Sequence, residues 1–265
     1  MGFHTIDELR RMIAQRGRND ITDLRISDKI TNRNYQKRVI ESVCKHYNNK
    51  HRRALLVMAT GTGKTRVSIS LVDVLVRNNW VKNVLFLADR IELVNQAKKN
   101  YTKFLPNMTV SSLRDSDADI SARILFSTYQ TMIGHLDKDT KTFSLGRFDL
   151  IIIDEAHRSV FGKYGAIFEY FDGLLLGLTA TPRDEVDRST YDLFGMEQGE
   201  PTDSYEYDEA VADGYLTPFR AIKDNSKILT EGINPDQLTP EEREQLEEIF
   251  EYEKMKAGLE PDAPY

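Results

Sequence analysis

Eight consecutive residues near position 60 combine the residue types that bind phosphate groups. Residues 58–65 read Met-Ala-Thr-Gly-Thr-Gly-Lys-Thr. A glycine-rich turn lets backbone N–H groups surround the β- and γ-phosphates of a nucleoside triphosphate, and Lys64 adds a positive charge. Thr65 supplies a hydroxyl that can coordinate Mg²⁺. The residues predicted to bind the nucleotide at this turn are Thr60, Gly61, Thr62, Gly63, Lys64 and Thr65.

The sequence on either side of this turn has the pattern that a phosphate-binding loop needs. Residues 54–57 form an apolar run suited to a buried strand, and residues 66–75 carry apolar side chains at helical spacing. One position departs from the strict motif, because Met58 stands where that motif has glycine. The alternative is an ordinary glycine- and threonine-rich loop. We favour the nucleotide site because strand, turn and helix follow one another in the required order.

A second stretch carries two adjacent carboxylates. Four branched apolar residues at 150–153 predict a buried strand, and Asp154 and Glu155 follow it directly. Ligands of open α/β sheets bind at the carboxyl ends of the strands. Asp154 can therefore hold Mg²⁺ through water, and Glu155 can orient and deprotonate an attacking water molecule. The alternative is a strand that happens to end in acidic residues. The predicted catalytic residues are Lys64, Asp154 and Glu155, and the predicted metal ligands are Thr65 and Asp154.

Apolar runs alternate with helical stretches through the middle of the chain. Strands are predicted at 54–57, 84–88, 124–127, 150–153 and 173–178. Helices are predicted at 39–47, 66–75, 91–104 and 128–136. Near-continuous apolar strands separated by helices are typical of a parallel sheet that is covered on both faces. The predicted fold class is therefore α/β.

The pattern changes from about residue 197. Residues 207–214 predict a short helix that stops at a glycine, and residues 215–222 predict an extended exit strand. A further helix start, with proline at its first position, lies at 239–242. Its apolar stripe has no following core to pack against, so we expect the last ~30 residues to be poorly ordered or docked elsewhere.

Charge is divided unevenly between these regions. The chain has 265 residues and a net charge of −6, but residues 197–265 hold 19 acidic and 6 basic side chains, and residues 1–196 hold 23 and 30. A mildly basic domain can bind a phosphate backbone locally, although its charge alone is weak evidence. There is no apolar run near the ~18 residues of a membrane span, no signal peptide and one cysteine, Cys44. We expect a cytoplasmic protein without a membrane segment.

The order of the motifs resembles that of the first motor domain of superfamily 2 helicases and translocases. The resemblance is carried by the glycine-lysine loop, by Asp154-Glu155-Ala156-His157 and by Thr179-Ala180-Thr181. It implies a RecA-like P-loop domain with a mainly parallel central sheet and helices on both faces. It also implies ATP and Mg²⁺ as cofactors. Gln36, which follows Tyr35, matches the position from which the superfamily reads adenine.

The resemblance implies further roles outside the phosphate loop. Leu87-Ala88-Asp89-Arg90 with Gln96, and Ser127-Thr128-Tyr129-Gln130, occupy the places of the motifs that grip a nucleic-acid backbone. Thr179 and Thr181 match the segment that couples nucleotide state to strand grip, through His157. The residues that the resemblance assigns to nucleic-acid binding are Arg90, Gln96 and Thr128.

Longer stretches are similar to the motor (R) subunit of type I restriction enzymes, and the related subunit of type III enzymes is close behind. These stretches lie at 154–159, 177–183 and 210–218, and the resemblance covers roughly 30–222. It implies a translocase of duplex DNA whose full-length form works with modification and specificity subunits. Two alternatives stay open: a helicase domain of another DNA or RNA pathway, and a nucleotide-responsive binding module that never hydrolyses ATP.

We expect three regions along the chain: a linker with a short helix at 1–30, the motor domain at 31–222 and an acidic connector at 223–265. A superfamily 2 motor closes its site with arginine fingers from a second RecA-like domain, and such a finger can be worth ~10³–10⁵ in rate. The arginines after residue 182 stand in no such setting. We therefore predict that the isolated chain binds nucleotide but hydrolyses it negligibly, and that hydrolysis belongs to the full-length protein.

Overall fold

The computed structural model describes residues 6, 9, 12, 13, 20–136, 142–156, 158–181, 183–186 and 188–218; for 158–163 and 184 it describes the backbone alone. Contacts divide the chain into one compact unit at 1–217 and a second at 218–265. All described residues except Pro218 belong to the first unit. Within the described ranges, no helix is both long and apolar enough to cross a membrane.

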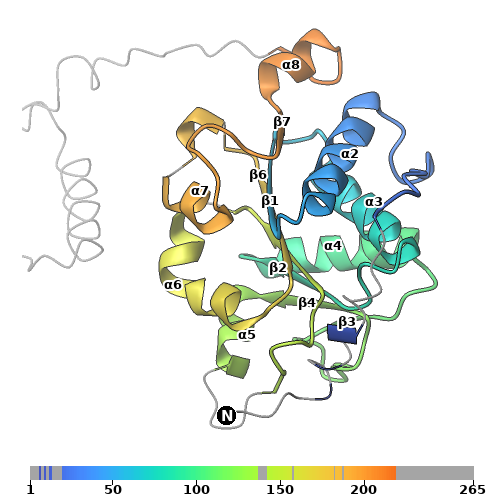
Figure 1. Ribbon diagram of the computed structural model, residues 1–265, viewed down its shortest axis with the longest axis vertical. Coiled ribbons are helices and arrows are strands. Elements are labelled where there is room, and N and C mark those ends of the chain that lie inside the picture. The colour runs from blue at the N-terminus through green and yellow to red at the C-terminus, as the bar shows by residue number, and fades with distance from the viewer. Residues whose placement is uncertain are drawn as a thin grey trace, which may run out of the picture. The chain divides into compact units, whose positions relative to one another are not determined.

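A seven-stranded sheet in which all pairs are parallel forms the centre of the first unit (Figure 1). Its order across the sheet is β3-β4-β2-β5-β6-β1-β7. The strands are β1 (Arg53–Met58), β2 (Val84–Ala88), β3 (Val110–Ser112), β4 (Ile124–Thr128), β5 (Leu150–Asp154), β6 (Leu174–Thr179) and β7 (Asp203–Tyr205). The predicted α/β fold and the five predicted strands are confirmed. The two edge strands, β3 and β7, were not predicted.

Helices cover both faces of this sheet, as Figure 1 shows. They are α2 (Asn34–Asn48), α3 (Lys64–Arg77), α4 (Ile91–Phe104), α5 (Tyr129–Leu136), α6 (Arg158–Tyr170), α7 (Arg188–Phe194) and α8 (Tyr207–Ala212), with a 3₁₀ turn, η1, at Arg183–Glu185. The predicted helices at 39–47, 66–75, 91–104, 128–136 and 207–214 match α2, α3, α4, α5 and α8. Helices α6 and α7 were not predicted.

Alternate side chains of each strand divide the apolar core into two layers. Leu56 and Met58 of β1 pack on the face that carries α2, α3 and α4. Leu55 and Val57 pack on the opposite face, which carries α5, α6 and α7. This alternation follows from the pleat of a strand, in which successive side chains point to opposite faces. Both faces are buried, so β1 is apolar after its exposed first residue, Arg53.

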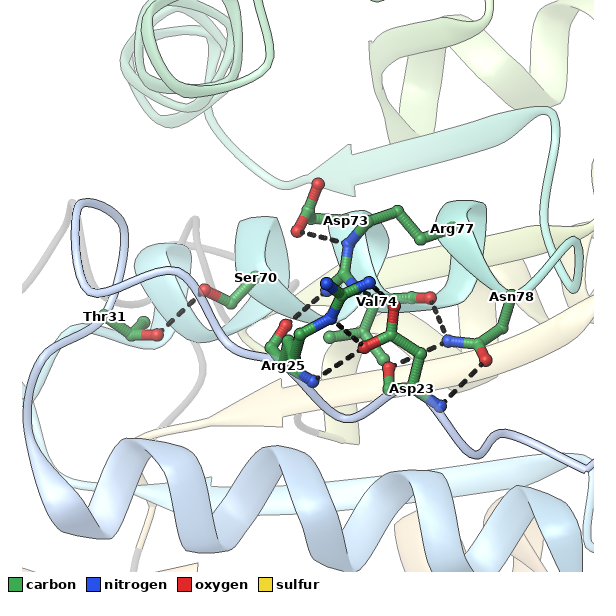
Figure 2. Close-up of polar contacts among 8 residues, drawn as sticks. All are labelled: Asp23, Arg25, Thr31, Ser70, Asp73, Val74, Arg77 and Asn78. Atoms are coloured by element: carbon green, nitrogen blue, oxygen red, sulfur yellow. Dashed lines mark hydrogen bonds and ion pairs between the residues drawn. The ribbon is translucent and has the colours of Figure 1, made fainter.

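Residues 21–31 lie along α3, although the sequence indicated a linker for most of this segment (Figure 2). The backbone N–H of Asp23 donates to Asn78 Oδ1 at 3.2 Å, and Asn78 Nδ2 donates to the Asp23 carbonyl at 3.0 Å. Closer to the phosphate loop, the hydroxyls of Thr31 and Ser70 are 2.9 Å apart. The predicted division of the chain at residues 30 and 222 stays a prediction. The apolar side chains that this segment adds to the core are Ile21 and Ile30.

The exit strand predicted at 215–222 is wrong for its described part, residues 215–218, which contain no strand. Helix α8 ends at Ala212, and Gly214, which follows its C-cap residue Asp213, has a φ of 74° in the left-handed region. The N–H groups of Tyr215 and Leu216 then both donate to the carbonyl of Ala210, at 2.9 and 3.0 Å. These capping bonds fold the chain back over the end of α8, as is common where a glycine follows a helix. Residues 219–222, the predicted helix after 239 and the acidic tail lie outside the described residues.

Candidate nucleotide site

Three neighbouring strands end together at the predicted nucleotide site. In the sheet, β6 lies between β1 and β5. Val57 of β1 is paired with Thr179 of β6, and Asp154 of β5 is paired with Leu178. The phosphate loop, the Asp154–Glu155 turn and the threonine segment therefore leave the sheet at the same carboxyl edge. This is the edge at which open α/β sheets bind ligands.

Two glycines give the phosphate loop its curvature. Gly61 and Gly63 have φ angles of 85° and 93°, which side chains rarely permit. Gly63 precedes α3 as its N-cap residue and makes no side-chain capping bond. A Cβ atom added at Gly63 would lie 2.6 Å from Gln36 Nε2, so the end of the Gln36 side chain would have to shift. The loop thus presents the start of a helix next to left-handed glycines, a geometry that binds phosphate.

Helix α2 holds this loop from one side. The Tyr35 hydroxyl donates to the carbonyl of Thr62 at 2.6 Å, and Gln36 Nε2 donates to the same oxygen at 2.9 Å. Both side chains are buried, and the Tyr35 ring stacks on Tyr205 of β7 at a centroid distance of 3.7 Å. Gln36 therefore lies beside the phosphate loop, and its contact with adenine stays a prediction. Sequence analysis did not assign Tyr35 to the site, and its position next to Gln36 was the available signal.

The structure shows why this chain has Met58 where the strict phosphate-loop motif has glycine. It is the last residue of β1, and its side chain is fully buried in the layer between the sheet and helices α2, α3 and α4. The position that the strict motif gives to glycine is therefore a core position in this chain. The loop begins one residue later and keeps its two left-handed glycines.

Lys64, Asp154 and Glu155 are brought together as predicted. Lys64 Nζ lies 3.5 Å from Glu155 Oε1 and donates to the Met58 carbonyl at 3.4 Å. Burial raises the pKa of Asp154 to about 6, the charge of Glu155 adds to this increase, and Lys64 opposes it. Glu155 has a φ of 55°, a conformation that is costly for a residue with a side chain and that occurs often at functional sites.

The donor set of this site fits a magnesium ion bound together with a nucleotide. Mg²⁺ prefers oxygen ligands and usually takes one or two carboxylates, with the rest of its shell from phosphates and water. The Asp154 carboxylate and the Thr65 hydroxyl are donors of this kind. Among the described residues, no group of three or more His, Cys, Asp or Glu side chains could hold a metal ion by itself. The site therefore suits a metal that arrives with phosphate groups.

The residues assigned to nucleic-acid binding lie near the neighbouring strand ends. Ala88 and Thr128 are paired at the ends of β2 and β4, and exposed Arg90 precedes α4. The hydroxyl of Thr128, which is 5% exposed, accepts the N–H of Thr131 at 3.2 Å. Gln96 is exposed farther along α4. Their contacts with nucleic acid stay predictions.

Of the residues assigned to coupling, Thr179 is buried, and its hydroxyl accepts the N–H of Thr181 at 3.1 Å. His157 lies outside the described residues. One further contact reaches the site from the first residue of α5: the hydroxyl of Tyr129 donates to the carbonyl of Asp154 at 2.9 Å. Sequence analysis named Tyr129 only as part of a nucleic-acid motif, because no pattern indicates which carbonyl a buried hydroxyl will meet.

Comparison with known proteins shows which family the chain belongs to. The family model described as the res subunit of type III restriction enzymes matches residues 29–184, which is more than half of the chain. The chain belongs to this family. Its place within the res-subunit family is indicated by individual relatives, which are mainly type I enzymes.

The endonuclease subunit of the type I restriction enzyme EcoAI from Escherichia coli is 36% identical over 211 residues, covering 77% of this chain and 25% of that protein. A solved fragment described as an HsdR subunit of a type I restriction enzyme from Vibrio vulnificus is 29% identical, with a TM-score of 0.56 over 80% of this chain and 38% of that one.

The helicase domain of Hef from Pyrococcus furiosus shares the fold, with a TM-score of 0.52, 24% identity and coverage of 68% of this chain and 40% of that one. The predicted resemblance to a superfamily 2 motor domain of the type I R-subunit kind is thus confirmed. The chain spans about a quarter of the length of the curated relative from Escherichia coli.

Proposed function

We propose that this chain is the nucleotide-binding first motor domain of an ATP-dependent DNA translocase, within the R subunit of a restriction enzyme. One observation carries the proposal: the phosphate loop, the Asp154–Glu155 turn and Thr179 lie together at the carboxyl edge of a RecA-like sheet. Membership of the res-subunit family supports it. In the full-length protein we expect duplex DNA and the modification and specificity subunits as partners, and a cytoplasmic location.

In this proposal, each residue of the edge has a separate task. The N–H groups of the loop and Lys64 bind the phosphates, and Thr65 and Asp154 hold Mg²⁺, which neutralises phosphate charge when bound. Glu155 orients a water molecule and accepts its proton. Lys64 Nζ lies 3.5 Å from Glu155 Oε1. Phosphates that bind Lys64 would compete with this ion pair and free the Glu155 carboxylate to act as a base.

Nucleotide binding is tested by replacing Lys64 with Ala and titrating ADP calorimetrically. The loss of a charge-assisted contact to phosphate, worth ~1.5–3 kcal/mol, should weaken binding roughly tenfold to a hundredfold. Lys98→Ala is the matched control, because Lys98 is also a partly buried, ion-paired lysine but contacts Asp115 instead. An unchanged dissociation constant for Lys64→Ala would refute the assignment of the site.

We also propose that the chain alone hydrolyses ATP negligibly. Lys64, Asp154 and Glu155 come from one sheet edge, and the described Arg183 is ion-paired with Glu206. Phosphate release by the 265-residue chain, with Lys64→Ala as the blank, tests this. DNA-stimulated turnover of ~1 s⁻¹ or more would contradict it. The same assay on the full-length protein, with and without duplex DNA, tests the second candidate, a binding module without turnover. A nuclease motif in the upstream coding sequence would separate a restriction translocase from the third candidate, a helicase domain of a different pathway.

A further inference from the structure

Residues 21–31, which we call the strap, contain no helix or strand and lie along α3 (Figure 2). Two asparagine side chains bind its backbone. Asn48 Oδ1 accepts the N–H of Ile21 at 2.8 Å, and Asn48 Nδ2 donates to the carbonyl of Ile21 at 3.3 Å. Asn78 binds the N–H and the carbonyl of Asp23 in the same way, at 3.2 and 3.0 Å. Asn48 is the last residue of α2 and Asn78 is the C-cap of α3, so this end of the strap is tied to both helices.

Ion pairs and an apolar side chain strengthen this attachment. Arg77 Nη1 lies 2.8 Å from Asp23 Oδ2, and the Arg77 guanidinium also donates to the carbonyl of Arg25. Hydrogen bonds from Arg25 and Arg77 hold the pKa of Asp23 below its ordinary value, so its carboxylate stays charged. Ile21 is 3% exposed and belongs to the core layer under α2, α3 and α4. The first end of the strap is therefore held by its backbone, by charge and by one apolar anchor.

The second end of the strap reaches the start of α3, where the phosphate loop ends. The carbonyl of Ile30 accepts a hydrogen bond from Arg66 Nη1 at 3.1 Å. The hydroxyls of Thr31 and Ser70 are 2.9 Å apart, and both residues are buried. Figure 2 shows this contact and the one between Asp23 and Asn78 at separate places along α3. The strap thus contacts the first two turns of the helix that begins at the phosphate loop.

The strap also leads directly into the side chains that hold this loop. Three residues separate Thr31 from Tyr35, and the side chains of Tyr35 and Gln36 both donate to the carbonyl of Thr62. Thr62 is flanked on each side by a left-handed glycine. Glycine has many accessible conformations, so a loop of this composition depends on outside contacts for its shape. Those contacts come from the start of α2 and the start of α3, and the strap joins the two.

The middle of the strap is open to solvent. A segment with few buried contacts opens locally at a lower cost in free energy than the core does. The strap can therefore leave α3 while the sheet stays folded. The exposed residues of the strap are Thr22, Leu24, Arg25, Asp28 and Lys29.

We propose that the strap is a regulatory element of the nucleotide site. When attached, it keeps the phosphate loop in the geometry that binds nucleotide, and its detachment from the N-terminal side lowers the affinity for nucleotide. The inference rests on the proposed function, because it requires this loop to bind nucleotide. The apparent affinity falls with the fraction of molecules in the attached state. Since such linkage is reciprocal, bound nucleotide must also favour the attached strap.

The first test is amide hydrogen exchange of the 265-residue chain with and without Mg²⁺ and ADP. The amides of Ile21 and Asp23 are held at the C-terminal ends of α2 and α3. These ends lie roughly 20 Å from the helix starts, so ADP at the loop does not cover them. ADP should slow their exchange by about fivefold or more, the effect of one ordinary hydrogen bond. The control amides are those of Ser112 and Asp119, which are also held by side chains but lie at the β3 edge of the sheet.

The second test detaches the strap by substitution. The double variant Asn48→Ala/Asn78→Ala loses four hydrogen bonds to the strap and leaves the loop unchanged. Each such bond is worth about fivefold in equilibrium, so the detached state should become populated and ADP should bind at least about fivefold more weakly. Exchange should also accelerate at Ile30 and Thr31, whose N–H groups donate to a carbonyl that the substitutions do not touch.

Asn49→Ala is the matched control, because Asn49 is the exposed C-cap of α2, as Asn78 is the C-cap of α3. It should change neither the affinity for ADP nor the exchange of the strap.

The outcomes separate the two proposals. A wild-type chain that binds no ADP would refute the proposed function and this inference with it. If ADP binds, the role of the strap alone is refuted when ADP slows the strap and control amides equally, or slows neither. A folded double variant that binds ADP as tightly as wild type would refute it as well. If the double variant does not fold, exchange in the wild type decides by itself.

Discussion

Replacing Asp154 by Asn should stabilise the ligand-free chain near pH 8. Burial and the charge of Glu155 raise the pKa of Asp154 from 3.8 to about 6. A folded-state pKa above the unfolded value means that the folded chain binds the proton more tightly, so wild-type stability falls as the pH rises from about 4 to about 6. Each pKa unit corresponds to ~1.36 kcal/mol, so the full effect is at most about 3 kcal/mol. Asparagine carries no charge and avoids this loss.

The assay is urea unfolding of wild type and Asp154→Asn at a series of pH values between about 4.5 and about 8, without Mg²⁺ or nucleotide. The difference in unfolding free energy should approach its maximum above about pH 6 and decline towards zero below about pH 4.5. Asp117→Asn is the control, because Asp117 is exposed and removing its charge involves little desolvation. When Mg²⁺ and ADP are added, the wild type should gain more stability than Asp154→Asn, since a ligand stabilises the state that binds it.

Two results would refute this reasoning. A difference that does not change with pH would mean that Asp154 carries no buried charge in the folded chain. A variant that is less stable than wild type near pH 8 would mean that contacts of the Asp154 carboxylate outweigh its desolvation. In either case Asp154 would not be a buried, ionised carboxylate that a metal ion could neutralise.

Three further predictions concern the same edge. Gly63→Ala should destabilise the chain by about 2 kcal/mol and weaken ADP binding, because a side chain is strained at its φ of 93°. Gly134→Ala should have neither effect, because a Cβ atom there meets nothing within 4 Å, and urea unfolding and calorimetry distinguish the two variants. Glu155→Gln in the full-length protein should keep ATP binding and lower steady-state turnover by ~10² or more, and an unaffected rate would contradict the role of Glu155 as a base. The affinity for duplex DNA, measured by filter binding, should fall steeply with salt and show no sequence preference, because the contacts are with backbone phosphates and not with base edges. An affinity that does not change with salt would argue against this interface.

The strands that carry the chemistry could be predicted because each is an unbroken apolar run buried on both faces. The edge strands could not, because β7 is only Asp203–Tyr205 and is defined by its pairing with β1 instead of by any periodicity. The proline-containing sequence of residues 215–218 indicated an extended strand, but the hydrogen bonds from Tyr215 and Leu216 to the Ala210 carbonyl fold this segment back over the end of α8.

Within the site, the motif spacing predicted which residues meet, and the structure brings Lys64 to Glu155 as expected. The carbonyls that the supporting tyrosine hydroxyls would meet were beyond prediction. Tyr35 and Tyr129 each find a backbone carbonyl more than 20 residues away, at Thr62 and at Asp154. Such contacts depend on how layers of the fold are stacked, and no local pattern records them.

The strand order has a consequence for the synthesis of this protein on the ribosome. Among the described residues, the neighbours of strand β1, which leads into the phosphate loop, are β6 and β7, and these begin at Leu174 and Asp203. The loop is thus made early, but its strand has no partner until more than a hundred further residues have followed. Pairing over such separations is slow, because the entropy of closing a long loop is lost before any contact forms. A nascent chain that stops before Leu174 therefore contains every residue of the phosphate loop and still lacks the strands that pair with β1.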